Sequence, residues 1–341
     1  MDPEVYNLEN DLTQFVGSDY AITCSSGTDA LLMALMSLGV KNGDYVVTTP
    51  FTYIATAEVI SLLGGVPEFV DIDESTFNIN PQLLELEINK VIKDEKLNPR
   101  AIISVDLFGL LADYNEIERI SRKFNLFLIE DAAQSFGATY NNKKACSFGN
   151  ASATSFYPAK PLGCYGDGGA VFTDDDDLAD ICKSIRVHGE GKDKYDNIHV
   201  GLNSRLDTIQ ASVLLNKMKI FDEELKLRNL VAKEYSKRIP ENVKAPYIPN
   251  GFSSSWAQYS ILFSNQDERN DIIDLLNKED IPTSVFYRVP FNKNKVYSSK
   301  VLNSFPVSEK ISESILSLPM HPYLSSDEIN KITSLISNYY K

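Results

Sequence analysis

Short apolar runs alternate with longer amphipathic stretches along the first part of the chain, and no other feature constrains the fold as strongly. The runs are rich in Val, Ile and Phe, which is typical of strands that are buried on both faces of a sheet. They are YVVTTP (45–50), PEFVDID (67–73), AIISVDLFG (101–109) and LFLIEDAA (126–133), with helical patterns at about 27–39, 54–64, 81–93 and 113–124. This alternation predicts an α/β fold with a mainly parallel central sheet flanked by helices.

The pattern changes after a long helical stretch at about 206–239. A connection punctuated by prolines, IPENVKAPYIPNG, follows that stretch and indicates a domain boundary. We therefore expect a large domain over residues 1–238 and a smaller α+β domain over residues 239–341. Within the smaller domain the patterns predict strands at 257–263 and 283–287, a helix at 266–279 and two helices towards Lys341.

The chain of 341 residues is strongly acidic, with 33 Lys and Arg against 47 Asp and Glu and a formal net charge of −14. Because such a chain repels nucleic acid phosphates and anionic membrane surfaces, we expect neither as a partner. No apolar run approaches the roughly 20 residues that cross a bilayer, so we expect no membrane span. The N-terminal MDPEVYNLEND also lacks the basic and apolar regions of a signal peptide.

The four cysteines are scattered along the chain, without a CxxC pair or a nearby histidine that would complete a zinc set. They are Cys24, Cys146, Cys164 and Cys182. We therefore expect no metal site. Buried, reduced thiols in a cytoplasmic protein are the simplest interpretation of this cysteine usage.

Ligands of open parallel sheets bind beyond the carboxyl ends of the strands, so the loops that follow the strands are the places to search for chemistry. In CSSGTDALLMAL (24–35), small and hydroxyl residues lead directly into a helix, which leaves free N–H groups around Gly27, Thr28 and Asp29. Helix N-termini of this kind bind anions, phosphate above all. An ordinary helix cap is the alternative for this loop taken alone.

A second loop, LIEDAAQSFGA (128–138), places Glu130 and Asp131 at the end of an apolar strand. A carboxylate at a buried strand end needs a cationic or hydrogen-bonding partner. It can serve as a metal ligand, a general base, the counter-charge of a bound cation or a structural cap. Gln134, one turn further on, can add a neutral hydrogen bond on the same side.

A third segment, TSFYPAKPLGCYGDGGAVFT (154–173), holds Lys160 between a strand-like run and a set of glycines. A lysine desolvated at such a junction has a lowered pKa, and its free amine can form a Schiff base with a carbonyl. Ser155 can hold the same phosphate as the first loop, and Gly166, Gly168 and Gly169 let the backbone approach a ligand. Most lysines are surface residues without such a role.

Together these loops predict one cofactor, pyridoxal 5'-phosphate. It needs a lysine for its aldehyde, an anion site for its phosphate, an acid against its pyridine nitrogen and a flat group over its ring. Lys160, the SGTD helix start, Asp131 and Tyr53 in TTPFTYIATAEVI can fill these places. The combination is far more specific than any one of its members.

The chain resembles the DegT/DnrJ-type nucleotide-sugar aminotransferases, pyridoxal-phosphate enzymes of fold type I. The matching segments are SGTDALLMAL, PFTYIATAEVI, PEFVDID, EDAAQSFGA, TSFYPAKPLGCYGDGGAVFT and GLNSRLDTIQA, and they are collinear over nearly the whole chain. The resemblance implies a catalytic pair, Lys160 as the Schiff-base lysine and Asp131 against the ring nitrogen. It also implies cofactor contacts from Gly27, Thr28, Asp29, Tyr53, Gln134 and Ser155, and from Asn203 of a partner subunit.

The reaction implied by the resemblance is transamination. L-glutamate donates its amino group, and a nucleotide-linked keto-sugar accepts it for the biosynthesis of a surface polysaccharide such as O-antigen. A homodimer with shared active sites follows, since Asn203 and the neighbouring Arg205 reach the other subunit's site. Arg205 is a candidate for the sugar nucleotide or the donor carboxylate, and His188 is a candidate for lining the substrate channel.

The identity of the sugar is less constrained. The segment 184–211 is most similar to enzymes that aminate C3 of a UDP-linked 2-acetamido-3-keto-glucuronate, whereas dTDP-3-keto-6-deoxyhexose aminotransferases share NSRLD. Relatives of the first group show His-Tyr-Pro where this chain has Phe286, Tyr287 and Arg288, so Tyr287 and Arg288 are the substrate candidates there. Alternatives are a 4-keto-sugar aminotransferase, a sugar dehydratase of the same fold, which Lys160 disfavours, and a regulator without catalysis.

The start of the chain differs from the usual pattern of the family. Family members usually carry a short helix and a turn before the segment that matches PEVYNLENDL, whereas Met1 falls almost within it here. That segment often lies near the sugar site in the family.

Overall fold

A computed structural model describes residues 2–93, 97–193, 195–299, 301 and 303–341. Its centre is a seven-stranded sheet, which confirms the α/β fold. In their order across the sheet the strands are β1 (Tyr20–Cys24), β9 (Gly169–Thr173), β8 (Ala151–Ser155), β5 (Phe127–Asp131), β4 (Asn98–Val105), β2 (Asp44–Thr48) and β3 (Val66–Phe69). The strands predicted from the apolar runs are therefore present as β2 to β5.

The central sheet is mainly parallel, as predicted. Only β9 runs against its neighbours, since it pairs antiparallel with both β8 and β1. The strands β1, β8 and β5 consequently point the same way, and their last residues, Cys24, Ser155 and Asp131, lie at one edge of the sheet. The three loops singled out in the sequence start from this edge.

Ten α-helices surround the sheets in the described part of the chain. They are α1 (Pro3–Val16), α2 (Gly27–Ser37), α3 (Ala55–Leu62), α4 (Pro81–Lys93), α5 (Tyr114–Phe124), α6 (Asp176–Ile185), α7 (Thr208–Arg238), α8 (Gln266–Asn277), α9 (Pro306–Ser314) and α10 (Ser326–Tyr339). Two short 3-10 turns, η1 (Leu107–Gly109) and η2 (Phe291–Lys293), complete the set. Among these described helices, none has both the length and the apolar character that a membrane crossing requires.

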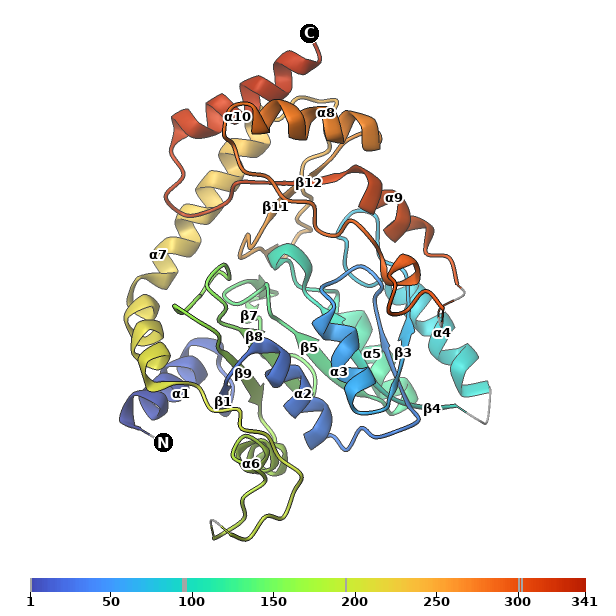
Figure 1. The fold of residues 1–341 in the computed structure, drawn as a ribbon, viewed down its shortest axis with the longest axis vertical. Coiled ribbons are helices and arrows are strands. Elements are labelled where there is room, and N and C mark those ends of the chain that lie inside the picture. Colours follow the sequence, from blue (N-terminus) through green and yellow to red (C-terminus); the bar gives the residue numbers. More distant parts are fainter. Residues whose placement is uncertain (1, 94–96, 194, 300, 302) are drawn as a thin grey trace.

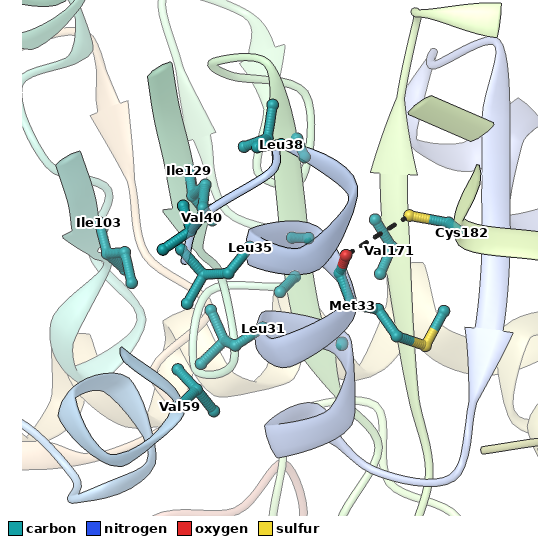
Figure 2. Close-up of a cluster of buried hydrophobic side chains, with 14 of the residues drawn as sticks. Leu31, Met33, Leu35, Leu38, Val40, Val59, Ile103, Ile129, Val171 and Cys182 are labelled. Carbon is teal, nitrogen blue, oxygen red and sulfur yellow. Dashed lines mark hydrogen bonds between the residues drawn. The ribbon is translucent and has the colours of Figure 1, made fainter. Parts of the chain in front are cut away.

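Both faces of the central sheet are buried, because alternate residues of its strands point to opposite sides. On one face, Ile103 and Ile129 pack against Leu31 and Leu35 of α2, with α3 and α6 beside it. Figure 2 shows α2 inserted between these strand residues and Val171 of β9. Burial on both faces explains why the runs in the sequence are apolar throughout.

The opposite face is covered by two pairs of helices. Ile102 and Leu128, which neighbour the residues of the first face in sequence, pack in the cluster that α4 and α5 form. Beyond them α1 and the first half of α7 cover β9, where Phe172 is buried together with Phe136. Each of these residues is removed from water, which contributes about 1.5–3 kcal/mol per large apolar side chain.

The C-terminal part of the chain forms its own core. The antiparallel strands β11 (Tyr259–Leu262) and β12 (Ile315–Leu318) pack with α8, α10 and the second half of α7. Figure 1 shows α7 passing diagonally from α1, beside the large sheet, to α10 near the C-terminus. One helix therefore contributes to both cores, and we keep the division at residues 238 and 239 as a proposal.

One predicted strand is wrong, and β12 is among the strands that were not predicted, as are β1 and β9 of the central sheet. Residues 283–287 form no strand, and their only ladder contact is a single bridge between Ser284 and Ser317. The partner of β11 is instead β12, a run of four residues that follows α9 directly. A four-residue apolar run next to a helix is easily assigned to the helix. In 283–287 the apolar residues serve other purposes, since Phe286 and Tyr287 line a cavity and Val285 packs against buried side chains.

Two further contacts join the C-terminal part to the large sheet. The buried Asp71, after β3, accepts hydrogen bonds from the backbone N–H groups of Val307 (2.9 Å) and Ser308 (3.0 Å), in the first turn of α9. The Asp71 carboxylate is favourable at the N-terminus of α9 because it meets the positive end of the helix dipole. The other contact is a small sheet, in the order β10 (Phe252–Ser253), β6 (Thr139–Tyr140) and β7 (Lys143–Lys144).

Candidate active site

The loops after β1 and β8 meet at the edge of the central sheet because glycine allows it. Ser26 caps α2, and its side chain accepts a hydrogen bond from the backbone N–H of Asp29 at 3.1 Å. A Cβ atom on Gly27 would lie only 2.6 Å from the Cβ atom of Ser155. A side chain at position 27 would therefore separate the helix start from the end of β8.

A cavity of about 440 Å³ opens at this junction. Gly27, Thr28 and Ser155 line it, together with Ser26. The first N–H groups of a helix lack intrahelical acceptors and carry the positive end of the dipole, so this corner suits a phosphate group.

Asp29 is the member of the predicted phosphate site that does not line this cavity. Its carboxylate accepts hydrogen bonds from the hydroxyl groups of Ser25 and, at 2.7 Å, of Ser204. Its backbone N–H is taken by Ser26. Asp29 therefore links the loop after β1 to Ser204 through these hydrogen bonds.

Lys160 lies in the turn that follows β8, where its backbone N–H donates to the carbonyl of Tyr157 at 2.8 Å. Its side chain lines the cavity, and its amine forms no hydrogen bond or ion pair with any described residue. Burial lowers the pKa of this amine, and the nearby charge of Asp131 opposes that change only in part. The site thus holds an amine that is desolvated and unpaired.

Asp131 is the last residue of β5 and is only 4% exposed. Its Oδ2 atom accepts a hydrogen bond from Thr56 Oγ1 at 2.8 Å, and its Oδ1 atom accepts one from the N–H of Ala133 at 3.3 Å. Burial raises the pKa of Asp131, while these hydrogen bonds lower it. With no cation bonded to it among the described residues, the carboxylate suits a cationic group placed in the cavity.

Gln134 and Tyr287 close another side of the cavity. The Gln134 side chain accepts from the N–H of Phe108 at 2.7 Å and donates to the Tyr287 hydroxyl at 3.1 Å. Burial raises the pKa of Tyr287, so its hydroxyl stays protonated at neutral pH. Tyr53 also lines the cavity, with 60% of its surface exposed, and so has a free aromatic face to offer.

Besides Asp29, four predicted residues lie outside this cavity. Arg288 faces a different groove, and His188 is exposed on the loop after α6. Asn203 and Arg205 are also exposed, and Arg205 Nη2 donates to Asn203 Oδ1 at 2.6 Å. Within one chain, these four side chains therefore do not line the cavity that holds Lys160 and Asp131.

Several cavity residues were not singled out from the sequence. Thr56 is the most important, because it bonds directly to the Asp131 carboxylate, and Thr52 lies next to it, with 3.3 Å between the two hydroxyl oxygens. Gln258 and Phe286 line the cavity from the C-terminal part of the chain. Thr52 precedes α3, which begins at Ala55, and nothing in the local sequence reveals which carboxylate the two threonines meet.

These features fit pyridoxal phosphate. The unpaired amine, the buried carboxylate without a counter-charge, the anion-binding corner and the open aromatic face line one cavity. In the described part of the chain, no group of three or more His, Cys, Asp or Glu side chains is arranged to hold a metal ion.

Comparisons with known proteins agree with this arrangement. A model of the DegT/DnrJ/EryC1/StrS aminotransferase family matches residues 1–337. The UDP-2-acetamido-2-deoxy-3-oxo-D-glucuronate aminotransferase of Pseudomonas aeruginosa is 45% identical, over 98% of this chain and 90% of its own length.

Two solved structures are similar over nearly the whole chain. A DegT DnrJ EryC1 StrS aminotransferase from Brucella abortus superimposes with a TM-score of 0.96 at 46% identity, covering 99% of this chain and 91% of that one. NtdA from Bacillus subtilis, with the bound cofactor PMP, superimposes with a TM-score of 0.90 at 28% identity, covering 99% of this chain and 77% of that one.

Proposed function

The chain belongs to the DegT/DnrJ/EryC1/StrS family and is a pyridoxal-phosphate-dependent nucleotide-sugar aminotransferase, and we propose that it transfers the amino group of L-glutamate to a UDP-linked 2-acetamido-3-keto sugar. One observation carries the chemistry of this proposal, namely the unpaired, desolvated amine of Lys160 beside the buried carboxylate of Asp131. The choice of sugar is supported by the similarity to the Pseudomonas aeruginosa enzyme.

Lys160 is the proton carrier in this proposal. Bound pyridoxal phosphate supplies a carbonyl for the amine and a ring that accepts the electron pair released when the donor loses its α-proton. Because burial lowers the pKa of Lys160, a larger share of its amine is neutral at physiological pH than for an exposed lysine. A neutral amine accepts a proton as general base and returns it as general acid.

Asp131 supplies the negative charge that balances a protonated ring nitrogen of the cofactor. Its buried carboxylate favours a protonated ring nitrogen, and Thr56 keeps the carboxylate ionised by donating a hydrogen bond to it. Gly27, Thr28 and Ser155 bind the cofactor phosphate through N–H and hydroxyl groups, and Tyr53 covers the ring.

A homodimer completes the site in this proposal. Asn203 and Arg205 are exposed and lie outside the cavity of their own chain, which suits residues that act in the other subunit. His188 belongs to the same exposed region and is proposed to approach the substrate from there. The four free cysteines support the cytoplasm as the place of action.

Tyr287 is the proposed contact to the acceptor sugar, because its hydroxyl lies in the cavity and is oriented by Gln134. Phe286 lines the cavity beside it and cannot donate a hydrogen bond. A dTDP-3-keto-6-deoxyhexose is the second candidate acceptor, favoured by the shared NSRLD segment at 203–207. The product of either reaction is an amino sugar for surface polysaccharide biosynthesis.

The test of the proposal is an assay of purified protein with L-glutamate and a panel of UDP- and dTDP-linked 3-keto and 4-keto sugars. We expect the fastest turnover with a UDP-linked 2-acetamido-3-keto sugar and a new amine at C3. Faster turnover with a dTDP sugar would select the second candidate, and failure of every sugar would refute both.

Lys160→Ala tests the chemistry separately from the choice of sugar. The variant should lose turnover while its circular dichroism stays that of the wild type, because the amine forms no hydrogen bond or ion pair with a described residue. The matched control is Lys226→Ala, which removes an exposed lysine at a surface ion pair with Glu223. Borohydride treatment should attach the cofactor to Lys160, and attachment to another lysine would contradict the assignment.

A further inference from the structure

The segment 285–288 borders two separate hollows. Phe286 and Tyr287 line the cofactor cavity, whereas Val285 and Arg288 line a groove of about 490 Å³. This groove is bounded by α8 and by the end of α9, and the two hollows share no lining residue. The groove is lined by an arginine, Arg269, that forms no ion pair with any described residue.

Arg269, from α8, is the buried charge of the groove, with 6% of its surface exposed. Its Nε atom donates to Asn270 Oδ1 at 3.0 Å, and Nη1 donates to the carbonyl of Ser312 at 3.4 Å. A guanidinium has five N–H donors, and the others have no acceptor among the described residues. Both acceptors are neutral, so they hydrogen-bond two of its N–H groups but do not balance its positive charge.

Arg288 adds a second positive charge. It is exposed, lines the same groove and forms no hydrogen bond or ion pair with any described residue. Both arginines line this groove. Burial lowers the pKa of Arg269, and repulsion from Arg288 lowers it further. Two like charges therefore face one hollow.

The other two buried arginines of the described chain each have a carboxylate nearby. Arg186 forms an ion pair with Glu9 at 2.6 Å, and Arg228 donates to the carbonyl of Trp256 and is attracted by Glu224. The chain has 47 acidic residues available, so an uncompensated pair of arginines is an exception in its own context. A buried charge without a counter-charge is costly, and a bound anion would remove that cost.

Two exposed carboxylates, Asp274 and Glu313, also line the groove, and neither forms an ion pair with Arg269 or Arg288. They disfavour a polyanion that fills the whole groove and restrict negative charge to the arginine end. A phosphate group matches this arrangement, because guanidinium groups bind its oxygens through paired hydrogen bonds. We propose that Arg269 and Arg288 together bind a phosphate-class oxyanion carried by a small molecule.

The proposal is tested by calorimetric titration of the cofactor-loaded protein with inorganic pyrophosphate at low ionic strength. Loading the cofactor first fills the phosphate corner at Gly27 and Ser155, so that only a second site is measured. We expect saturable binding to the wild type. Arg288→Gln should weaken it about 10- to 100-fold, the usual effect of removing a hydrogen-bonding charge. Since Arg288 is exposed, this variant keeps the fold.

Arg122→Gln is the matched control, because it removes one equally exposed arginine, from α5, and changes the net charge by the same amount. Its affinity for pyrophosphate should equal that of the wild type. Equal weakening in both variants would reduce the effect to overall charge and overturn the proposal, as would the absence of saturable binding. Arg269→Lys, which keeps a charge and loses the paired donors, should also weaken binding.

Inhibition kinetics with pyrophosphate distinguish which small molecule carries the phosphate that binds in the groove. Competition between pyrophosphate and the sugar acceptor would assign the groove to the acceptor's own diphosphate, whereas inhibition or activation without competition would assign it to a separate ligand. Both results require that pyrophosphate binds in the groove. The titration does not depend on turnover, so a wrong choice of sugar would leave its outcome unchanged.

Discussion

Replacing Thr56 by Val tests whether a neutral hydroxyl, rather than a charged group, prepares Asp131 for its cofactor. The Thr56 hydroxyl donates to Asp131 Oδ2 at 2.8 Å, and both residues are buried. Valine has nearly the shape of threonine and lacks the donor. The substitution therefore removes one hydrogen bond and leaves the packing of α3 close to that of the wild type.

The size of the effect follows from the charge of the acceptor. A hydrogen bond to a charged group contributes about 1.5–3 kcal/mol. Among the described residues, the carboxylate accepts only one other hydrogen bond, from the N–H of Ala133 at 3.3 Å. Without Thr56, burial raises the pKa of Asp131 further and favours its neutral form. Since a neutral Asp131 no longer attracts the ring nitrogen, Thr56→Val should weaken cofactor binding about 10- to 100-fold.

The measurement is equilibrium dialysis of the cofactor against the purified variant at several pH values. The loss should be largest at low pH, where the raised pKa of Asp131 leaves the least carboxylate. Thr56→Ser keeps the hydroxyl and should bind the cofactor within a few-fold of the wild type. If the serine and valine variants bind equally well at every pH, the hydrogen bond to Asp131 has no part in holding the cofactor.

Three further outcomes are expected. Asp71→Asn should lower the free energy of unfolding by about 1–3 kcal/mol in urea, because the amide cannot accept from both the N–H of Val307 and its other donors; no change would refute the tie between β3 and α9. Gly27→Ala should release the cofactor at concentrations that saturate the wild type, visible as a lost absorbance band, since its Cβ atom would overlap Ser155. Burial raises the pKa of Asp106 well above its usual range, so the folded chain keeps a proton that the unfolded chain loses above about pH 4. The free energy of unfolding should therefore fall as the pH rises through that pKa, and Asp106→Asn should flatten the slope by at most about 1.4 kcal/mol per pH unit; an unchanged slope would contradict this.

Much of the fold could be predicted from the sequence because its strands are apolar on both faces, and the central sheet confirms this prediction. The segment 283–287 was misassigned for a physical reason, since an apolar run that lines a cavity and one that pairs in a sheet have the same composition. The family and the cofactor were also predicted correctly, because several loops had to supply matching chemistry at once. The roles of the individual site residues stay predictions.

The sequence by itself determined which chemical groups are present and where along the chain they follow a strand, because apolar periodicity and local caps act over a few residues. Only the tertiary structure decided which groups meet. It brought Thr56 to Asp131 across 75 positions of the chain, and it placed Arg288 with Arg269 in a groove separate from the cofactor cavity. The direction of a side chain depends on what packs around it, and that packing is a property of the whole folded chain.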